Sequence, residues 1–557
     1  MLRKLVRFGG LGLAASASGV GACAVYKYNT DEGVKRTMRF GWAVAPMVIA
    51  YSTADKKDME KLHEKWAPEM LRIVLSQRGY YIKAAQMMCG VGILPDAYDE
   101  SLKVLLDDVP PRDTKLIRSI VEKELAIPIE EVFSTFENKP IGAASIGQVH
   151  LATLKNGHRC VVKVQYPEVE GFFRLDLETI KAFCKLAMPD ANTDQMFDEV
   201  AKSFVSEFDY RLEAENLRIA GDNLKKAGMA SRALIPEPID SKHLKCPPVF
   251  KAREGGLCSK KVMVMDAIDG KPVKKVMRQV FEEMAEAQSL TVDELLEDMK
   301  KQFEDPEKLR AMLSQPPPSE FSIKVGLFVM RLQEYTWNSA AFLYNCTAGM
   351  LAPKLQYQHK TIPPNGAKLT RILYDIHGHQ VLRDGLFNAD PHPGNVLICS
   401  DRRIGLIDYG NMPSLSDQER IDFARLIVAL DKQDDPAILD AFSKLGYTVR
   451  GAKENDATAE KLLLMSAYGD FDQQYGTEFF NEHFGFPADM PLMELMEKVE
   501  SEMKGADLEI QVPANVINLQ RLVMVLNGVA TATGAGNVRP SAMWRKKADE
   551  LLALHDK

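Results

Sequence analysis

The segment at residues 390–410 constrains this chain more than any other, because polar residues there bracket two short apolar runs. In order it contains Asp390-Pro-His-Pro-Gly-Asn395, Val396-Leu-Ile398, Asp401-Arg-Arg403, Ile404-Gly-Leu-Ile407 and Asp408-Tyr-Gly410. Short apolar runs separated by a polar turn predict two strands of a hairpin. A loop therefore precedes the first strand, and an aspartate stands at the end of the second.

The spacing of the polar residues points to nucleotide chemistry. Asp390 and Asn395 are five residues apart, as in the catalytic loop of protein kinases, and Asp408-Tyr-Gly410 stands where those enzymes have Asp-Phe-Gly. Because magnesium prefers hard oxygen ligands, we expect Asn395 and Asp408 to hold it, and Asp390 to position a hydroxyl or a water for attack. Each motif alone is weak, and a turn aspartate before glycine is common, but their joint order is specific.

A lysine upstream completes the pattern. Lys163 is the one charge in the apolar run Val161–Val164, which reads as a strand. A buried charge without a partner is costly, so this lysine needs anions, such as the ATP phosphates and a carboxylate. Asn156-Gly157 predicts a hairpin just before it. A loop of small residues precedes that hairpin and would cover the phosphates, although an ordinary tight turn is the alternative. The loop consists of Gly142, Ala143, Ala144, Ser145, Ile146 and Gly147.

Acidic partners for the lysine are predicted on one long helix, whose apolar residues recur every three or four positions from Phe197 to Leu212. Glu207, Asp209 and Glu213 lie on it, and we expect one of them to pair with Lys163 rather than all to form a solvated face. Further along, an apolar strand ends at a predicted hinge that would contact adenine. The hinge residues are Met265, Asp266 and Ile268.

Together these residues resemble the UbiB family of atypical kinases, also called aarF-domain kinases. The resemblance rests on the alanine-rich loop at 142–148, Glu207-Phe208-Asp209, the D-P-H-P-G-N run at 390–395 and D-Y-G at 408–410. Lys83-Ala-Ala-Gln86 matches the family's K-x-G-Q motif, with Ala85 in place of glycine, and Asn388 stands where the family often has histidine. The resemblance covers roughly residues 55–270 and 373–540.

The resemblance implies an α+β, two-lobed, protein-kinase-like fold, with an N-terminal helical extension over the active site and a helix-rich C-lobe. It implies that ATP and Mg²⁺ are the cofactors, that Glu213 pairs with Lys163, and that Asp390 is the catalytic-loop aspartate. It also implies a regulatory role for residues of the extension and the acidic residues that face it, namely Lys83, Gln86, Glu207 and Asp209. Ala85 puts the geometry of that extension in question.

Family members look like ATPases or restrained kinases connected to coenzyme Q and other lipids. The expected partners are therefore ATP, a membrane lipid or quinone precursor, and lipid-biosynthetic enzymes. The alternative is a nucleotide-binding pseudokinase scaffold or lipid-handling protein without significant turnover. An ordinary protein kinase is disfavoured, because a helix cap at Ser416 follows Gly410 too closely for a regulatory activation segment. The net charge of −7 argues against a nucleic-acid partner.

The rest of the chain is divided by composition. We expect a targeting and membrane-proximal segment at 1–54, a helical extension at 55–136, an N-lobe at 137–273, a helical insertion at 274–372 and a C-lobe at 373–557. The basic, acid-poor start favours a mitochondrial location, at the inner membrane, over a plastid. Residues 9–26 are uncharged and would form a transit peptide or a short membrane helix, whereas the apolar stretch 40–51 is too short to span. The apolar part of the insertion, 327–351, is best interpreted as a core helix, with a membrane or partner contact as the alternative.

Overall fold

The computed structural model describes residues 31–555 apart from internal gaps. The gaps are 56–57, 90–93, 107–108, 188–196, 198–200, 202–204, 206, 293, 296–297, 299–318, 348–351, 360, 362, 454–455, 475–477, 489, 491–493, 496–497, 500, 502–504, 506–507 and 537. The uncharged segment 9–26 lies outside the described residues. In the described part of the chain, no helix is both long and apolar enough to cross a bilayer.

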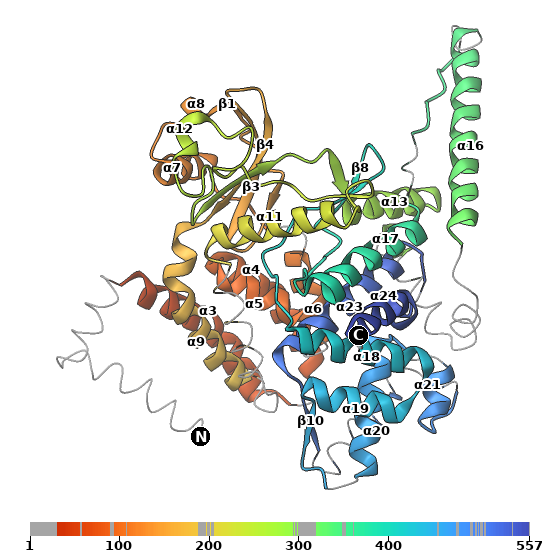
Figure 1. The fold of residues 1–557 in the computed structure, drawn as a ribbon. Helices are drawn as coiled ribbons and strands as arrows, with labels where there is room; N and C mark the ends of the chain where they lie inside the picture. Colours follow the sequence, from red (N-terminus) through yellow and green to blue (C-terminus); the bar gives the residue numbers. More distant parts are fainter. Residues whose placement is uncertain are drawn as a thin grey trace, which may run out of the picture. The chain divides into compact units, whose positions relative to one another are not determined.

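The chain is organised in two compact units (Figure 1). The first contains residues up to 214 together with 238–267, and the second contains 215–237 together with 268 onward. Each unit combines helices with its own mainly antiparallel sheet, which confirms the predicted α+β class.

Helices make up most of the start of the first unit. Their bounds are α3 (Glu32–Thr53), α4 (Met59–Gln77), α5 (Tyr80–Met88), α6 (Asp96–Lys103), a short 3-10 turn η3 (Val104–Leu106), α7 (Thr114–Leu125) and α8 (Ile129–Val132). Asp31 caps α3 by accepting backbone N–H groups, as N-cap aspartates do. The stretch 40–51 lies within α3 and turns Phe40, Val44 and Met47 into the core, so it covers the core from one face.

A five-stranded sheet follows in the first unit, with β1 starting at Phe133, a few residues before the expected onset of strands. Its strands are β1 (Phe133–Phe136), β2 (Gly142–Ala143), β3 (Gly147–Leu154), β4 (Arg159–Gln165) and β6 (Val262–Asp266), in the order β1-β3-β4-β6 with β2 beside β3. The hairpin predicted at Asn156-Gly157 joins β3 to β4, and Gly157 supplies the positive φ of 83° that this turn requires. Two further helices of this unit are α9 (Pro167–Ala187) and α12 (Pro248–Lys251).

The predicted long helix is interrupted, which corrects the sequence interpretation. Glu207 and Phe208 form a turn, and a new helix, α11 (Tyr210–Lys226), begins after Asp209. The apolar periodicity of the sequence continues across this turn, because Phe208 is buried although its backbone is not helical. Glu207 and Asp209 are therefore loop residues, whereas Glu213 is helical.

The sheet of the second unit has the order β5-β9-β8-β7. Its strands are β5 (Ala233–Leu234), β7 (Gly270–Pro272), β8 (Val396–Cys399) and β9 (Ile404–Leu406). The hairpin predicted from the segment 390–410 is present as β8 and β9, which pair antiparallel with Val396 opposite Leu406. A second, two-stranded sheet pairs β10 (Thr448–Arg450) with β11 (Glu509–Gln511).

Helices form the bulk of the second unit. They are α13 (Val273–Ala287), α16 (Glu320–Cys346), α17 (Gly366–His379), η5 (Gln380–Asp384), α18 (Asp417–Lys432), α19 (Asp435–Leu445), α20 (Ala457–Ser466), η6 (Ala467–Phe471), α21 (Glu478–His483), α23 (Ala514–Ala532) and α24 (Pro540–His555). The predicted capping box of Ser416 and Glu419 opens α18. Trp544 of α24 is fully buried and donates its indole N–H to the Tyr374 carbonyl of α17 at 2.7 Å, which joins these two helices.

Helix α16 contradicts the core-helix interpretation of the insertion. Ala341 is the buried residue of this helix, and most of its large apolar side chains are exposed. A segment at 352–359 returns alongside it without helical structure (Figure 1).

Candidate functional site: a lysine–glutamate pair and a magnesium-type loop

The first unit brings Lys163 and Glu213 together. Lys163 lies in the middle of β4, opposite Val149 of β3 and Met263 of β6, and its ammonium group lies 2.6 Å and 2.8 Å from the two Glu213 carboxylate oxygens. Glu213 is almost completely buried, with 6% of its side chain exposed, and Lys163 is 19% exposed. An ion pair removed from water this far needs both partners, because either charge alone would be costly to bury.

The alanine-rich loop is a tight turn between β2 and β3. The Ala144 N–H donates to the Gly147 carbonyl at 2.8 Å, and the Tyr166 N–H donates to the Ile146 carbonyl at 2.7 Å. Gly147 is required here, since a Cβ at this position would lie 2.4 Å from the Val164 carbonyl oxygen. At Gly142 a Cβ would meet nothing within 4 Å. The loop is thus held close to the strand that carries Lys163.

A buried polar network fixes the other end of this loop. The Gln148 side-chain oxygen accepts the Arg112 backbone N–H at 2.7 Å and the Tyr166 hydroxyl at 2.9 Å, while its nitrogen contacts His150 Nε2 at 2.8 Å. His150 Nδ1 lies 2.7 Å from the Glu137 carbonyl, so the ring proton sits on Nδ1 and Nε2 accepts from Gln148. Sequence reasoning missed this network, since it joins positions far apart in the chain.

The K-x-G-Q-like motif lies on α5, next to the same loop. Lys83 forms an ion pair with Glu207 at 2.9 Å, and Gln86 donates to the Leu105 carbonyl at 2.7 Å. Asp209, expected to face Lys83, accepts hydrogen bonds from the Arg211 guanidinium, the shorter at 2.6 Å. Ala85, which replaces the family's glycine, is buried within the helix, where its methyl group is accommodated.

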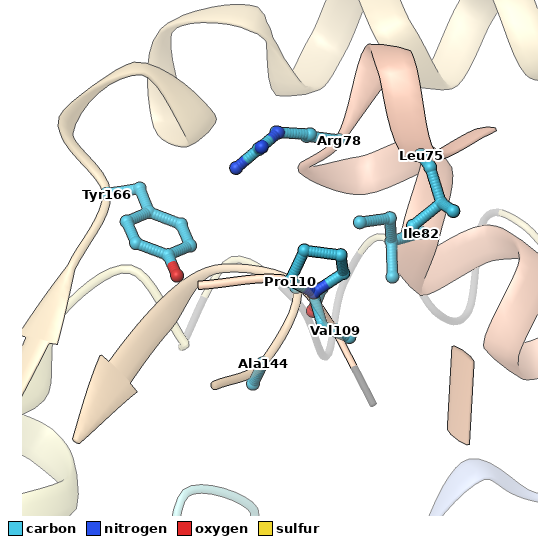
Figure 2. Close-up of a pocket in the computed structure, with 8 residues that line it drawn as sticks. Leu75, Arg78, Ile82, Val109, Pro110, Ala144 and Tyr166 are labelled. Carbon is cyan, nitrogen blue, oxygen red and sulfur yellow. The ribbon is translucent and has the colours of Figure 1, made fainter. Parts of the chain in front are cut away.

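A small cavity lies between the start of α5 and the alanine-rich loop (Figure 2). It has about 10 Å³ of space, which is room for about one water molecule. Arg78, at the junction of α4 and α5, extends across it toward the side on which Tyr166 lies, and Ala144 lies opposite. Burial raises the pKa of Tyr166 to about 12 against the opposing charges of Arg112 and Arg78, so its hydroxyl stays protonated. The cavity is too small for a nucleotide, but it places a cation beside the loop.

In the second unit, the β8–β9 hairpin positions Asn395 and Asp408. The Ile407 N–H donates to the Asn395 carbonyl at 3.1 Å, and Asp408 follows directly, so both side chains leave the same end of the hairpin. Asn388 ties the two loops together, because its amide donates to the Asp408 carbonyl at 2.8 Å and its oxygen accepts the Asp390 N–H at 2.9 Å. Asn388, which stands where the family often has histidine, therefore holds the two loops together by hydrogen bonds.

Asp390 has a partner that the sequence did not reveal. Arg521 of α23 forms an ion pair with it at 2.7 Å, and the two side chains are 47% and 37% exposed. His392 in the same loop accepts the Gly394 N–H on Nδ1 at 3.1 Å, and burial, together with the positive charge of Lys274, lowers its pKa. A neutral His392 leaves Asp390 and Arg521 as the charged pair of this loop.

The three predicted hinge residues differ in burial and in the groups that they contact. Met265 is buried within β6, and the Ile268 side chain packs over Gly405 of β9. Asp266 is contacted by His158 Nε2 at 2.7 Å and His243 Nε2 at 3.4 Å. Burial would raise the pKa of Asp266, but the hydrogen bonds from His243 and His158 hold it below its usual value.

This histidine–aspartate cluster has the residue types of a metal site, but its hydrogen bonds argue otherwise. His243 Nδ1 accepts the Lys245 backbone N–H at 3.1 Å. The ring proton is therefore on Nε2, the atom that faces Asp266, whereas a metal-bound histidine carries its proton on the nitrogen away from the metal. The cluster is best understood as a group of hydrogen bonds that holds the end of β6.

The residues at 395 and 408 do fit a magnesium–nucleotide group. The Asn395 carboxamide is half-buried and makes no hydrogen bond to the described residues, so its oxygen is available as a hard ligand. The Asp408 carboxylate accepts the Gly410 N–H at 3.0 Å, which orients it. In the first unit, taken by itself, the loop of small residues lies close to the strand that carries the paired Lys163.

Comparisons with known proteins agree with this chemistry. A family model described as the ABC1 atypical kinase-like domain matches residues 104–305 and 354–442, a little over half of the chain. The unmatched stretch between these ranges contains the whole of α16.

Individual relatives carry related names. The chain is 26% identical over 428 residues to the Arabidopsis thaliana protein Activity of BC1 complex kinase 1, chloroplastic, covering 74% of this chain and 48% of that protein. It is 24% identical over 459 residues to AarF domain-containing protein kinase 1 of Gallus gallus, covering 78% of this chain and 69% of the relative. Over 218 residues it is 34% identical to the probable protein kinase UbiB of Shewanella piezotolerans, covering 38% and 37%. It spans about half the length of the Arabidopsis relatives it matches.

Proposed function

Because the chain belongs to the ABC1 family of atypical kinases, which includes the UbiB and aarF-domain kinases, we propose that it binds ATP with Mg²⁺ and catalyses ATP hydrolysis or phosphoryl transfer. The observation that carries this proposal is the Lys163–Glu213 ion pair, whose nitrogen and oxygen lie 2.6 Å apart in the middle of a kinase-type sheet. In protein kinases the corresponding pair must be in place for catalysis.

The roles follow from the contacts. Lys163, held by Glu213, donates hydrogen bonds to phosphate oxygens, and the loop 142–147 covers those phosphates with backbone N–H groups and small side chains. Asn395 and Asp408 supply oxygen ligands to magnesium, and Asp390 accepts the proton of the attacking hydroxyl or water. The backbone at Met265 and Asp266, with the apolar Ile268, meets adenine. Bound Mg-ATP supplies the phosphoryl group and the cation that neutralises its charge.

The helical extension has a regulatory role in this proposal. Lys83 and Gln86 hold α5 in place through Glu207 and the Leu105 carbonyl, and α5 borders the phosphate-covering loop. Asp209 fixes Arg211 at the entry to α11. The Lys83–Glu207 pair therefore limits how freely the loop moves, and through the loop it restrains turnover.

The substrate class and the cellular location are inferred from the relatives and from the first residues of the chain. Family members named UbiB and chloroplastic kinases support an organelle or membrane setting, and the basic, acid-poor first residues of this chain favour the mitochondrial inner membrane over a plastid. We place its substrate among membrane lipids or quinone precursors, in support of coenzyme Q or lipid homeostasis, with lipid-biosynthetic enzymes as partners.

A second candidate function is favoured by one observation, the Arg521–Asp390 ion pair. With its catalytic-loop carboxylate occupied, the protein would bind nucleotide and organise lipid enzymes without significant turnover. The two functions make different predictions for a single measurement.

That measurement is magnesium-dependent ATP hydrolysis by the full chain, with and without anionic vesicles, beside Asp408→Asn. Asp401→Asn is the matched control, because Asp401 lies in the exposed turn of the same hairpin and pairs with Arg403. Turnover that is lost in Asp408→Asn and kept in Asp401→Asn supports the enzyme. Nucleotide-dependent thermal stabilisation without turnover supports the scaffold, and the absence of both would show that these residues form no working nucleotide site.

A further inference from the structure

Helix α16 carries an apolar seam with a strict seven-residue repeat. Its aromatic members are exposed: Phe321 by 75%, Phe328 by 65%, Tyr335 by 74% and Phe342 by 60%. Four residues after each aromatic comes the second member of the seam, in the order Val325, Leu332, Ser339 and Cys346. We call these eight residues the α16 seam. Positions that alternate by four and three residues over several turns are the pattern of a helix that packs against another helix.

The chain already covers one flank of the same helix, next to the aromatic members. The Asn338 carboxamide donates to the Gln358 carbonyl at 2.7 Å and accepts its N–H at 2.8 Å, and Asn345 binds Leu355 in the same two-way manner. At 100° per residue, Asn338 lies about 60° from Tyr335 and about 40° from Phe342, so the asparagines run along one flank of the aromatic members. The return segment 352–359 therefore occupies a neighbouring face and leaves the α16 seam uncovered by the described residues.

The chemistry of α16 favours a protein helix over a lipid surface. Helices that lie on membranes carry Lys and Arg on their polar face, which anionic headgroups attract. The charged residues of α16 are Glu320, Lys324, Arg331 and Glu334, whose charges cancel. The seam also repeats every seven residues, which a partner helix follows by supercoiling, whereas a flat surface imposes no such period.

We propose that the α16 seam is a dimerisation surface on which α16 of a second copy of this chain packs in antiparallel orientation. In an antiparallel pair each aromatic of one copy faces a second member of the seam, four residues after an aromatic, on the other copy. Phe321 then lies opposite Cys346 of the second copy, Phe328 opposite Ser339, Tyr335 opposite Leu332 and Phe342 opposite Val325. Every layer then sets an aromatic ring against a side chain smaller than itself, which is how facing positions fill space. A parallel pair would instead stack ring on ring and leave the Ser339 and Cys346 layers empty.

The area of the seam is sufficient for a stable dimer. Each aromatic side chain carries on the order of 200 Å² of surface, and most of it is exposed in all four. Two copies would bury on the order of 1,000 Å² from the aromatic rings alone, with Val325 and Leu332 adding more. Specific interfaces bury about 1,200–2,000 Å² in total.

The first test is the oligomeric state of the full chain, measured by sedimentation velocity over a concentration series. The expected result is a dimer whose dissociation constant rises by roughly 100-fold in Phe328→Asp, because each substitution places a charge in two layers of the pair. Gln333→Asp is the matched control, since Gln333 is exposed on α16 outside the seam. Helix content measured by circular dichroism should be the same in both variants.

The second test is the orientation. In Phe321→Cys, mild oxidation should join the introduced thiol of one copy to Cys346 of the other, and adding Cys346→Ser should abolish the crosslink. A crosslink that survives Cys346→Ser would show a parallel pair and overturn the antiparallel register. A protein that is monomeric at all concentrations would overturn the proposal. So would vesicle binding by a monomer that Phe328→Asp abolishes, because it would assign the seam to lipid.

Discussion

The close approach of Gly147 to β4 gives the sharpest test of the first unit. In Gly147→Ala the new methyl group would lie 2.4 Å from the Val164 carbonyl oxygen and 2.7 Å from the Tyr210 hydroxyl. The first of these is a backbone atom, which cannot rotate aside, so β3 and β4 must move apart. Gly142→Ala is the matched control in the same loop, because its methyl group would meet nothing within 4 Å.

The magnitude follows from the cost of overpacking, which is about 1–3 kcal/mol for an added methyl group in a packed site. A backbone obstacle puts Gly147→Ala at the upper end, about 3 kcal/mol. For a unit of this size each kcal/mol lowers Tm by about 2–4 °C, so we expect a loss of about 6–12 °C. Gly142→Ala should change Tm by less than about 2 °C, since surface substitutions cost little.

Function should change along with stability. Val164 follows Lys163 directly, so a displaced β4 moves the ammonium group away from Glu213. We expect the Kd for ATP to rise at least about tenfold in Gly147→Ala and to stay within about threefold in Gly142→Ala. Thermal unfolding and nucleotide titration of both variants check this. Equal stability and equal ATP affinity in the two variants would refute the argument from the Gly147 contact.

Three further predictions concern single side chains. Burial lowers the pKa of His377 to about 4, below its unfolded value of about 6.5, so its neutral form stabilises the fold fully above pH 6.5 and the contribution is lost as pH falls toward 4. This shift corresponds to about 3 kcal/mol of unfolding free energy. His377→Gln should therefore reduce the change in urea-unfolding free energy between about pH 7 and pH 4.5. An unchanged pH dependence would refute this. Arg78→Ala should weaken ATP binding by about threefold to tenfold in calorimetry, because it removes a cation beside the loop, whereas Arg72→Ala, exposed on α4, should not; equal effects would contradict it. Glu213→Gln should abolish turnover and lower the unfolding midpoint in urea by the equivalent of about 3 kcal/mol, whereas Asp222→Asn, exposed on the same helix, should change neither; retained turnover would exclude the proposed role of the pair.

Local patterns allowed accurate prediction where the chemistry is local. Asn156-Gly157 specifies its hairpin through glycine's positive φ, and the Ser416 capping box satisfies its own helix end. The β8–β9 hairpin was predictable for the same reason, since its strands and turn lie within one short segment. That hairpin alone determines that Asn395 and Asp408 leave the same end.

Contacts between distant segments were not accessible in this way. Arg521 reaches Asp390 across more than a hundred residues, and neither its spacing nor its neighbours mark it. The turn at Glu207 was not predictable, because Phe208 continues the apolar spacing of a helix although its backbone forms a turn. Exposure of α16 was hidden as well, since an apolar stripe has the same sequence whether its partner is the core or another molecule.

The attachment of α16 has a consequence for how such a segment enters or leaves a chain. Asn365, which caps α17, donates to the backbone carbonyl of Glu320, the first residue of α16, at 2.9 Å, and Arg371 of α17 pairs with the Glu320 carboxylate at 3.0 Å. The segment between Glu320 and Asn365 therefore begins and ends at one point of the second unit. Removing residues 321–364 would leave two ends that a very short linker can join, so a segment of this kind can be gained or lost as a module while α17 and the helices behind it stay in place.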